Sequence, residues 1–239
     1  MNISALLQAD MNRNVSRAQK ELLHWHCRLG HASMKRIQNL LRLSTPEGER
    51  YMKTKESKAA SCEIPQCLAC ELGKAKRTND HLPPRASDDE MHLWRDNLHP
   101  GDCVSVDHFI CHNKGRLPTT ARKEKAAEKF SRALIVVDHA SSYINVAHQI
   151  QLRGPETLKF KHTFEAFAND FGLSIKKYRS DKGTFAKRLW SEDCEIKKQK
   201  QDFARIGAHH QNGVAERAIQ TITGWARTMI IHTALHWPE

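Results

Sequence analysis

The spacing of apolar residues predicts two long helices in the second half of the chain. After Gly154-Pro155, four phenylalanines recur at i, i+4, i+7 and i+11, namely Phe160, Phe164, Phe167 and Phe171. Gly172 follows them and is a common helix stop signal. A second helix begins near Asn212, a residue type that caps helices, and its apolar stripe consists of Val214, Ala218, Ile222, Trp225 and Met229. Glu216 lies off this stripe and therefore points elsewhere.

Short apolar runs predict β-strands ahead of each of these helices. Five such runs cover residues 103–110, 133–137, 143–150, 174–179 and 203–207. The second and third runs are separated by the turn-like sequence at 138–142, so we expect them to form a hairpin. The charged stretch 114–129 suits a loop or hairpin tip, and 182–200 is basic and weakly patterned.

The first third of the chain predicts a small helical module. Ser33 can cap a short helix whose apolar stripe is Met34, Ile37, Leu40 and Leu41. Residues 44–61 are charged with few apolar side chains, which favours an exposed, potentially disordered insertion. Residues 1–20 are mostly polar and are predicted to be a flexible or helical extension. The basic, Pro-containing stretch 76–101 is predicted to be a linker.

The composition favours a polyanionic partner. The 239 residues carry 38 Lys and Arg against 27 Asp and Glu, a formal charge of +11, and such an excess supplies sequence-independent contacts to phosphates. Charge alone also fits an ordinary basic protein. No apolar run approaches the roughly 20 residues of a membrane span, and residues 1–10 lack the basic start of a signal peptide. Seven cysteines, an odd number, suit a reducing compartment and metal binding.

Two histidines and two cysteines have the spacing of a structural zinc site. His26 and His31 lie close together in the sequence, and Cys67 and Cys70 form a Cys-x2-Cys turn that lets both sulfurs face one ion. A module of this size has a small core, so a metal would supply much of its folding energy. These four residues are therefore predicted to bind one Zn²⁺.

Two other cysteines compete for the zinc-ligand roles. Cys62 precedes Cys67 at a spacing that is poorer than Cys-x2-Cys, and Cys27 lies between the two histidines. The alternative interpretation is a set of unrelated exposed histidines and reduced cysteines. The predicted helix between the histidine pair and the cysteine pair favours the zinc site.

Three acidic residues on separate elements indicate a second, oxygen-rich metal site. Asp107 lies within a predicted strand, where an unpaired buried charge is costly. Asp181 follows the strand predicted at 174–179, and Glu216 lies in the first turn of the last helix, where a carboxylate is favoured. Magnesium prefers oxygen ligands, and two ions about 3.5–4 Å apart can activate a nucleophile and stabilise a leaving oxygen in phosphodiester chemistry.

These acids also have ordinary interpretations and rivals. Asp181 could be a turn residue, and Glu216 could be an exposed helix residue. Asp138 ends an apolar run and is the strongest rival for either aspartate, whereas Asp102 follows Pro-Gly and fits a turn. The pair His209-His210 could contact a substrate, but neighbouring histidines before a polar turn are more often solvated.

Three motifs in the chain have the character of a family signature. Residues 23–31, LHWHCRLGH, are similar to a Leu-Trp-His-x-Arg-Leu-Gly-His signature, and residues 67–74, CLACELGK, to a Cys-x2-Cys-x2-Gly-Lys element. Residues 211–217 reproduce the string Gln-Asn-Gly-Val-Ala-Glu-Arg. From about Leu22 to its end, the chain resembles the integrase of copia-type LTR retrotransposons, within the retroviral integrase superfamily.

This resemblance implies an α/β fold in which an RNase H-like mixed five-stranded sheet, flanked by helices, follows a small helical zinc-binding module. It implies an extension at 1–20, a zinc-binding module with two His and two Cys at 21–75, a linker at 76–101 and a catalytic core, incomplete at its C-terminus, at 102–239. The implied catalytic triad, which holds two Mg²⁺ or Mn²⁺ ions, is Asp107, Asp181 and Glu216. The implied ligands of one structural Zn²⁺ are His26, His31, Cys67 and Cys70.

The activity that the resemblance implies is DNA integration, in which 3′ ends of the element's DNA are trimmed and joined to target DNA. We expect DNA as the partner, a homo-multimer when the protein is complete, and no membrane association or secretion. The expected place of action is the nucleus, after import from the cytoplasm. Residues near the acids in sequence could contact phosphates or could be solvated, namely Arg179, Lys182, Arg217 and Gln220.

The chain departs from the family pattern in four ways. Lys182 stands where Asn is usual, and 34 residues separate Asp181 from Glu216, one fewer than usual. His209-His210 replaces a more typical Thr-Pro, and the chain stops before the closing helices of the core and the C-terminal DNA-binding region. Two alternative functions follow: a catalytically inactive, zinc-dependent DNA-binding remnant of an integrase, and an RNase H-like nuclease that uses only water.

Overall fold

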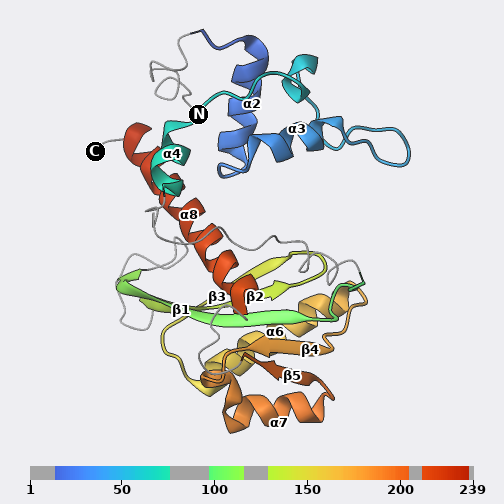
Figure 1. The fold of residues 1–239 in the computed structure, drawn as a ribbon, viewed down its shortest axis with the longest axis vertical. Helices are drawn as coiled ribbons and strands as arrows, with labels where there is room; N and C mark the ends of the chain where they lie inside the picture. The colour runs from blue at the N-terminus through green and yellow to red at the C-terminus, as the bar shows by residue number, and fades with distance from the viewer. Residues whose placement is uncertain (1–13, 76–96, 116–128, 205–211, 237–239) are drawn as a thin grey trace, which may run out of the picture. The chain divides into compact units, whose positions relative to one another are not determined.

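The computed structural model describes residues 14–75, 97–115, 129–204 and 212–236 (Figure 1). Its contacts divide the chain into two compact units. We call residues 1–80 together with 221–239 the N-terminal unit, and residues 81–220 the sheet unit. Helix α8 (Gly213–His236) contributes its first turns to the sheet unit and the rest to the N-terminal unit. The sequence prediction had assigned all of residues 102–239 to one core.

Five strands form one mixed sheet in the sheet unit (Figure 1). They are β1 (Val104–Gly115), β2 (Phe130–Asp138), β3 (Ile144–Gln149), β4 (Lys177–Ser180) and β5 (Lys200–Phe203). Their order is β3-β2-β1-β4-β5, with β1–β2 and β2–β3 antiparallel and β1–β4 and β4–β5 parallel. The predicted mixed five-stranded sheet and the β2–β3 hairpin are confirmed.

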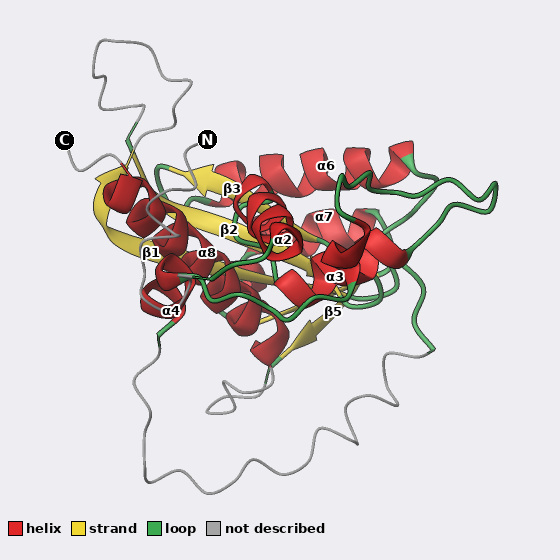
Figure 2. Ribbon diagram, turned by 90° about the horizontal axis from the view of Figure 1, so that it is seen from above, coloured by secondary structure: helices red, strands yellow, loops and turns green. Residues whose placement is uncertain are grey.

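Helices α6 (Gly154–Asp170) and α7 (Arg188–Ile196) lie next to one another beside the sheet, as both ribbon views show (Figures 1 and 2). They bury one face of β1, β2 and β4 in a core that includes Val104, Val106, Leu134, Val136, Phe164, Tyr178, Trp190 and Cys194. The predicted phenylalanine stripe of α6 is buried only in part, because Phe164 is 4% exposed but Phe171 is 67% exposed.

One helix in this region was not predicted, and one predicted strand lies elsewhere. The weakly patterned stretch 182–200 contains α7 and the short 3-10 helix η4 (Thr184–Ala186), which are fixed by a few large side chains such as Phe185 and Trp190. The last strand was expected at 203–207, whereas β5 ends at Phe203. Lys200 and Gln201 pair with β4 despite their polar character, because the edge of the sheet is half exposed.

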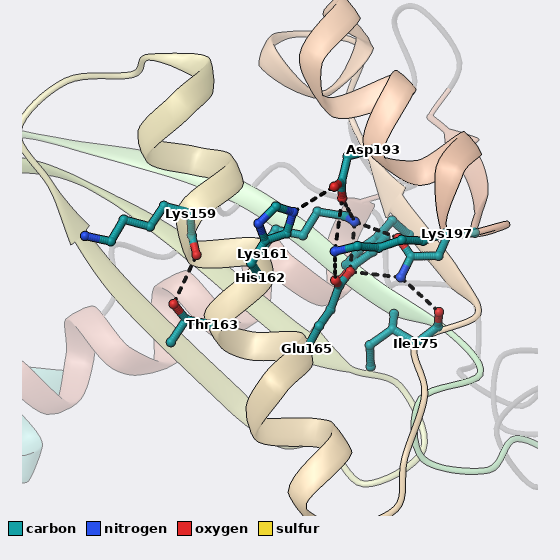
Figure 3. Close-up of polar contacts among 10 residues, drawn as sticks. Lys159, Lys161, His162, Thr163, Glu165, Ile175, Asp193 and Lys197 are labelled. Atoms are coloured by element: carbon teal, nitrogen blue, oxygen red, sulfur yellow. Dashed lines mark hydrogen bonds and ion pairs between the residues drawn. The ribbon is translucent and has the colours of Figure 1, made fainter.

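A buried ionic network joins α6 to α7 and to Gln199, the residue before β5 (Figure 3). The Lys161 side chain is fully buried, and its ammonium group contacts Asp193, Glu165 and Gln199, the last at 2.6 Å. Lys197 donates to the second Glu165 oxygen at 2.6 Å. Burial opposes ionisation of Glu165, but hydrogen bonds from Lys161, Lys197 and Gln199 prevail and lower its pKa. The network therefore fixes the elements that flank β4.

Within residues 14–75, the N-terminal unit contains three short helices and a 3-10 turn. These are α2 (Arg17–Arg28), α3 (Met34–Arg42), η2 (Ser57–Ala60) and α4 (Leu68–Lys74). Helix α2 starts before the predicted boundary at residue 21, because Ser16 and Gln19 form a reciprocal capping box. Ser33, the predicted cap of α3, makes no side-chain capping bond. The stretch 44–61 is partly ordered, since Ala59 is fully buried.

The buried face of α8 includes Ala218, as predicted, but otherwise differs from the predicted stripe. Ala215, Ala218, Thr228 and His232 are buried, whereas Met229 is 45% exposed. The stripe was predicted from hydrophobicity alone. The two fully buried side chains of this helix are instead the small Ala215 and the polar Thr228. Within the described ranges, no helix is long and apolar enough to cross a membrane.

Candidate metal centres

The two histidines and two cysteines come together in the N-terminal unit. One ligand atom from each of His26, His31, Cys67 and Cys70 lies within 4.8 Å of the other three. The two imidazole nitrogens are 3.1 Å apart, His26 Nε2 lies 3.3 Å from Cys70 Sγ, and His31 Nδ1 lies 3.5 Å from Cys67 Sγ. A tetrahedral zinc with Zn–N of about 2.0–2.1 Å and Zn–S of about 2.3 Å separates N from N by about 3.3 Å and N from S by about 3.6 Å. The donor set and its spacing fit Zn²⁺.

Backbone groups orient both histidines. His26 Nδ1 lies 2.7 Å from the Ala32 carbonyl oxygen, which favours a proton on Nδ1 and leaves Nε2 as the lone-pair donor. Gly30 and His31 both have left-handed backbones, with φ of 63° and 61°. A left-handed backbone is unfavourable for a non-glycine residue such as His31, so the loop after α2 stores backbone strain while it positions the imidazole. Lys74 donates to the His31 carbonyl at 3.2 Å.

The pKa values of the two cysteine ligands shift in opposite directions. Hydrogen bonds from Cys67, His26 and His31 lower the pKa of Cys70. For Cys67, the hydrogen bond to Cys70 and burial of the thiol raise the pKa. One thiolate is therefore favoured without a cation, and the second requires one.

The two competing cysteines lie differently. Burial and the charge of Cys70 raise the pKa of Cys27 to about 11, which favours its neutral thiol. Besides the His/Cys cluster, the described residues include a second group that could hold a metal, Cys27, His31 and His232. Cys62 lies near Gln38 and the Ala59 carbonyl and belongs to neither group.

The register of the parallel strands brings the two aspartates to one edge of the site. Ser105 of β1 is paired with Arg179 of β4, and Asp107 and Asp181 each follow two residues later. Neighbouring strands lie about 4.8 Å apart, and β4 ends at Ser180, so Asp181 lies in the segment that leaves the sheet next to β1. Alternation along β1 directs Asp107 to the sheet face opposite that of Val106 in the core.

The charges of Asp181 and Glu216 act on the pKa of Asp107. Burial raises its pKa to about 6, with further contributions from the charges of Asp181 and Glu216. Hydrogen bonds to Asp107 from the His108 amide, at 2.8 Å, and from Asn212 act in the opposite direction. A cation would relieve the repulsion, and three carboxylates suit Mg²⁺.

The three carboxylates do not, however, converge as closely as the His/Cys cluster. They are not among the described groups whose ligand atoms all lie within 4.8 Å of one another. Asp181 is exposed, and its Oδ1 accepts from its own turn, from the Gly183 amide at 3.3 Å. A side chain at Gly183 would contact this carboxylate, because an added Cβ would lie 3.2 Å from Oδ2.

The two rival aspartates have structural partners. Asp138 is 5% exposed and accepts from the Gly101 amide at 2.9 Å and from the Ser141 amide and hydroxyl at 2.7 and 2.6 Å. Asp102 is bound to Lys176 at 2.7 Å and to the His99 amide at 2.8 Å. Asp138 therefore joins the loop before β1 to the turn after β2, and Asp102 joins the same loop to Lys176, ahead of β4.

Two residues near Asp107 were not assigned to the site from the sequence. Asn212 was expected to cap α8, but its Oδ1 has no hydrogen-bond partner within the described ranges, and its Nδ2 donates to the Val106 carbonyl at 3.3 Å. His108 stacks on Phe185 at 4.7 Å, and burial lowers its pKa to about 4. Its position next to Asp107 in β1 was the available signal.

The four candidate DNA contacts differ in exposure. Lys182, Arg217 and Gln220 are exposed, and the Arg217 Nε donates to the Gly213 carbonyl at 3.3 Å. The Arg179 side chain is only 22% exposed, and its Nε lies 3.9 Å from Asp202 Oδ2 on β5. The pair His209-His210 lies outside the described residues.

Comparisons with known proteins match parts of the chain. HTLV-2 integrase catalytic core domains in complex with magnesium are similar at 15 and 16% identity and a TM-score of 0.40; the matches cover 59% of this chain and 77 and 78% of those. A chain of a simian T-cell lymphotropic virus intasome in complex with PP2A regulatory subunit B56 gamma is 16% identical, with a TM-score of 0.42, covering 84% of this chain and 57% of that one. No curated protein sequence matches. Residues 2–75 match the family model of the GAG-pre-integrase domain, and the N-terminal region is thus similar to that domain.

Proposed function

We propose that this chain is a retrotransposon integrase that processes DNA 3′ ends and transfers them into target DNA. The observation that supports the proposal is the environment of Asp107: burial and the charges of Asp181 and Glu216 raise its pKa. The strand that carries Asp107 also pairs in parallel with β4, the strand that precedes Asp181. The match of residues 2–75 to the GAG-pre-integrase domain supports the same assignment. The nucleus is the proposed place of action, and DNA and further copies of the chain are the proposed partners.

The proposed roles follow from the chemistry of the side chains. Asp107, Asp181 and Glu216 would hold two Mg²⁺ or Mn²⁺ ions, which supply a Lewis acid for attack by water or a 3′-hydroxyl on phosphorus. Asp107, on the buried strand, gives the site a fixed point. Lys182, Arg217 and Gln220 are exposed and available to phosphates, whereas Arg179 must leave Asp202 to reach one.

Zinc is proposed to be structural rather than catalytic. His26, His31, Cys67 and Cys70 would fill four positions of a closed tetrahedral site, which leaves no place for a substrate. The formal charge of +11 favours binding to DNA whatever its sequence.

The decisive experiment is strand transfer of a labelled DNA duplex in Mg²⁺ or Mn²⁺. Wild-type chain should yield joined products, and Asp107→Asn, Asp181→Asn and Glu216→Gln should each abolish them while binding DNA normally. Asp102→Asn is the matched control, because its partners are Lys176 and a backbone amide. Activity that survives all three triad substitutions would refute the assignment.

One alternative is supported by a specific observation. The three carboxylates do not lie within 4.8 Å of one another among the described residues, which is compatible with a zinc-dependent DNA-binding remnant that has lost catalysis. That protein would bind DNA with steep salt dependence but form no product with either metal. Cleavage without joining would instead indicate a nuclease of the same fold.

A further inference from the structure

The second half of α8 presents one face to the rest of the N-terminal unit. Thr228, Ile231 and His232 occupy positions i, i+3 and i+4 and therefore share a face. Thr228 is fully buried and His232 is 9% exposed, and Ile231 packs against the core formed by α2 and α3. On the other side, Ile230 is 69% exposed. This face is packed against the elements that carry the His/Cys cluster.

The closest contact is between α8 and α4, the helix that carries Cys70. An added Cβ at Gly73 would lie 2.7 Å from the Thr228 Cα and 2.8 Å from its backbone nitrogen. Real Cβ atoms do not approach a backbone this closely, so only glycine permits the two helices to lie at this distance. The glycine of the Cys-x2-Cys-x2-Gly-Lys element therefore has a packing role.

A second contact reaches the cluster itself. The His232 ring meets the His31 ring edge to face, with centroids 4.7 Å apart. A ligand atom of His232 lies within 4.8 Å of those of His31 and Cys27. A side chain on α8 thus lies directly behind one of the four proposed zinc ligands.

We infer that metal binding at His26, His31, Cys67 and Cys70 also fixes the second half of α8, with His232 as the positioning residue that joins the helix to the centre. The metal would tie α4 to the loop after α2, and α8 contacts both of these segments. Helix α4 has 7 residues, too few to be stable alone, so the surface that receives α8 depends on the metal.

This inference rests on the proposed zinc binding and is independent of the proposed DNA chemistry. It gives the zinc centre a role beyond the small N-terminal module. Helix formation is cooperative, so ordering the second half of α8 favours helical structure in its first turn, which carries Glu216.

Hydrogen exchange of the full chain, with zinc and after its removal by a chelator, tests the inference. Zinc removal should accelerate exchange of amides 225–236 by about tenfold or more and leave β1, β2 and β3 unchanged. A chain that binds one zinc but shows the same exchange at 225–236 in both states would overturn the inference while the zinc site stands. A chain that binds no zinc would overturn both.

A pair of neighbouring variants tests His232 separately. His232→Ala should weaken zinc binding by about tenfold in a chelator competition, whereas Thr233→Ala, on the exposed face, should leave it unchanged. His232→Gln keeps a polar side chain and should restore part of the affinity, which a role in packing alone would not predict. Equal affinities for the His232→Ala and Thr233→Ala proteins would refute the role of His232.

Discussion

The two candidate metal centres differ in how far their ligands are assembled without a cation. The imidazoles and thiols of the N-terminal unit already lie at distances that suit a tetrahedral ion, because they can donate hydrogen bonds to one another. In the sheet unit, the charges of Asp181 and Glu216 instead oppose ionisation of Asp107 and raise its pKa. Ligands that attract one another can be positioned by the fold alone, whereas ligands that repel one another need the ion to complete their arrangement.

The largest expected effect is loss of the His/Cys centre. A Cys67→Ser, Cys70→Ser protein should bind no zinc, and its N-terminal unit should lose cooperative unfolding, because structural zinc supplies about 10–16 kcal/mol of apparent binding free energy. Metal analysis and thermal unfolding measure this. Cys111→Ser, at an exposed cysteine, is the control. One zinc per chain in the double variant would show that other ligands are used.

The next largest effect concerns the support of the sheet unit, which contains no proposed zinc ligand. Lys161→Ala removes the fully buried cation between Glu165 and Asp193 and leaves the more exposed Lys197 as their remaining shared cation. It should destabilise the sheet unit by about 3 kcal/mol. Lys159→Ala, on the exposed side of α6, should change little. Denaturant unfolding compares them. Equal stability of the two variants would mean that the network of Figure 3 contributes no net stability.

A smaller effect of opposite sign is expected at Asp107. Its pKa is raised to about 6, so above that pH the fold must hold a disfavoured charge. Asp107→Asn should therefore stabilise the metal-free protein at pH 8 by about 1–2 kcal/mol and abolish stabilisation by added Mg²⁺. The measurement is thermal unfolding with and without Mg²⁺. Undiminished stabilisation of the variant by Mg²⁺ would exclude Asp107 as a ligand.

The smallest effect is the pH dependence of the sheet unit. The pKa of Glu165 in the fold is below its ordinary value of 4.5, so its contribution is complete above that pH and is lost as the pH falls through the lowered value. Unfolding followed from pH 6 down to 3 should show this loss, and Glu165→Gln should reduce the slope. An identical slope in the variant would assign the acid sensitivity to other groups.

The sequence predicted the sheet and the zinc ligands' proximity because both rest on strong local patterns. Alternating and dense apolar runs define β1, β2 and β3, and the Cys-x2-Cys turn needs only a short segment. Helix α7 was missed because its stability comes from Trp190 and Cys194 against the core and from a network whose members are far apart in sequence. The predicted buried face of α8 was wrong because Thr228 is buried by its close backbone contact with Gly73. A hydrophobicity scale does not take such a contact into account.

The placement of the three acids was predictable in order but not in distance. Asp107 was identified as an unexpected charge in a strand, and the resemblance added Asp181 and Glu216. Asp181 accepts a hydrogen bond from Gly183 in its own turn, and Asp138 accepts one from Ser141. Both contacts depend on turn geometry, which the spacing of residues in the sequence does not specify.

The hydrogen bond from Asn212 to the Val106 carbonyl has a consequence for the number of residues allowed between Asp181 and Glu216. Val106 is one residue before Asp107, and Asn212 is four residues before Glu216, so this amide links the strand of the first acid to the helix of the third. The number of residues between Asp181 and Glu216 does not enter that link. Relatives could therefore gain or lose residues after β5 and still present the first and third acids in the same relation.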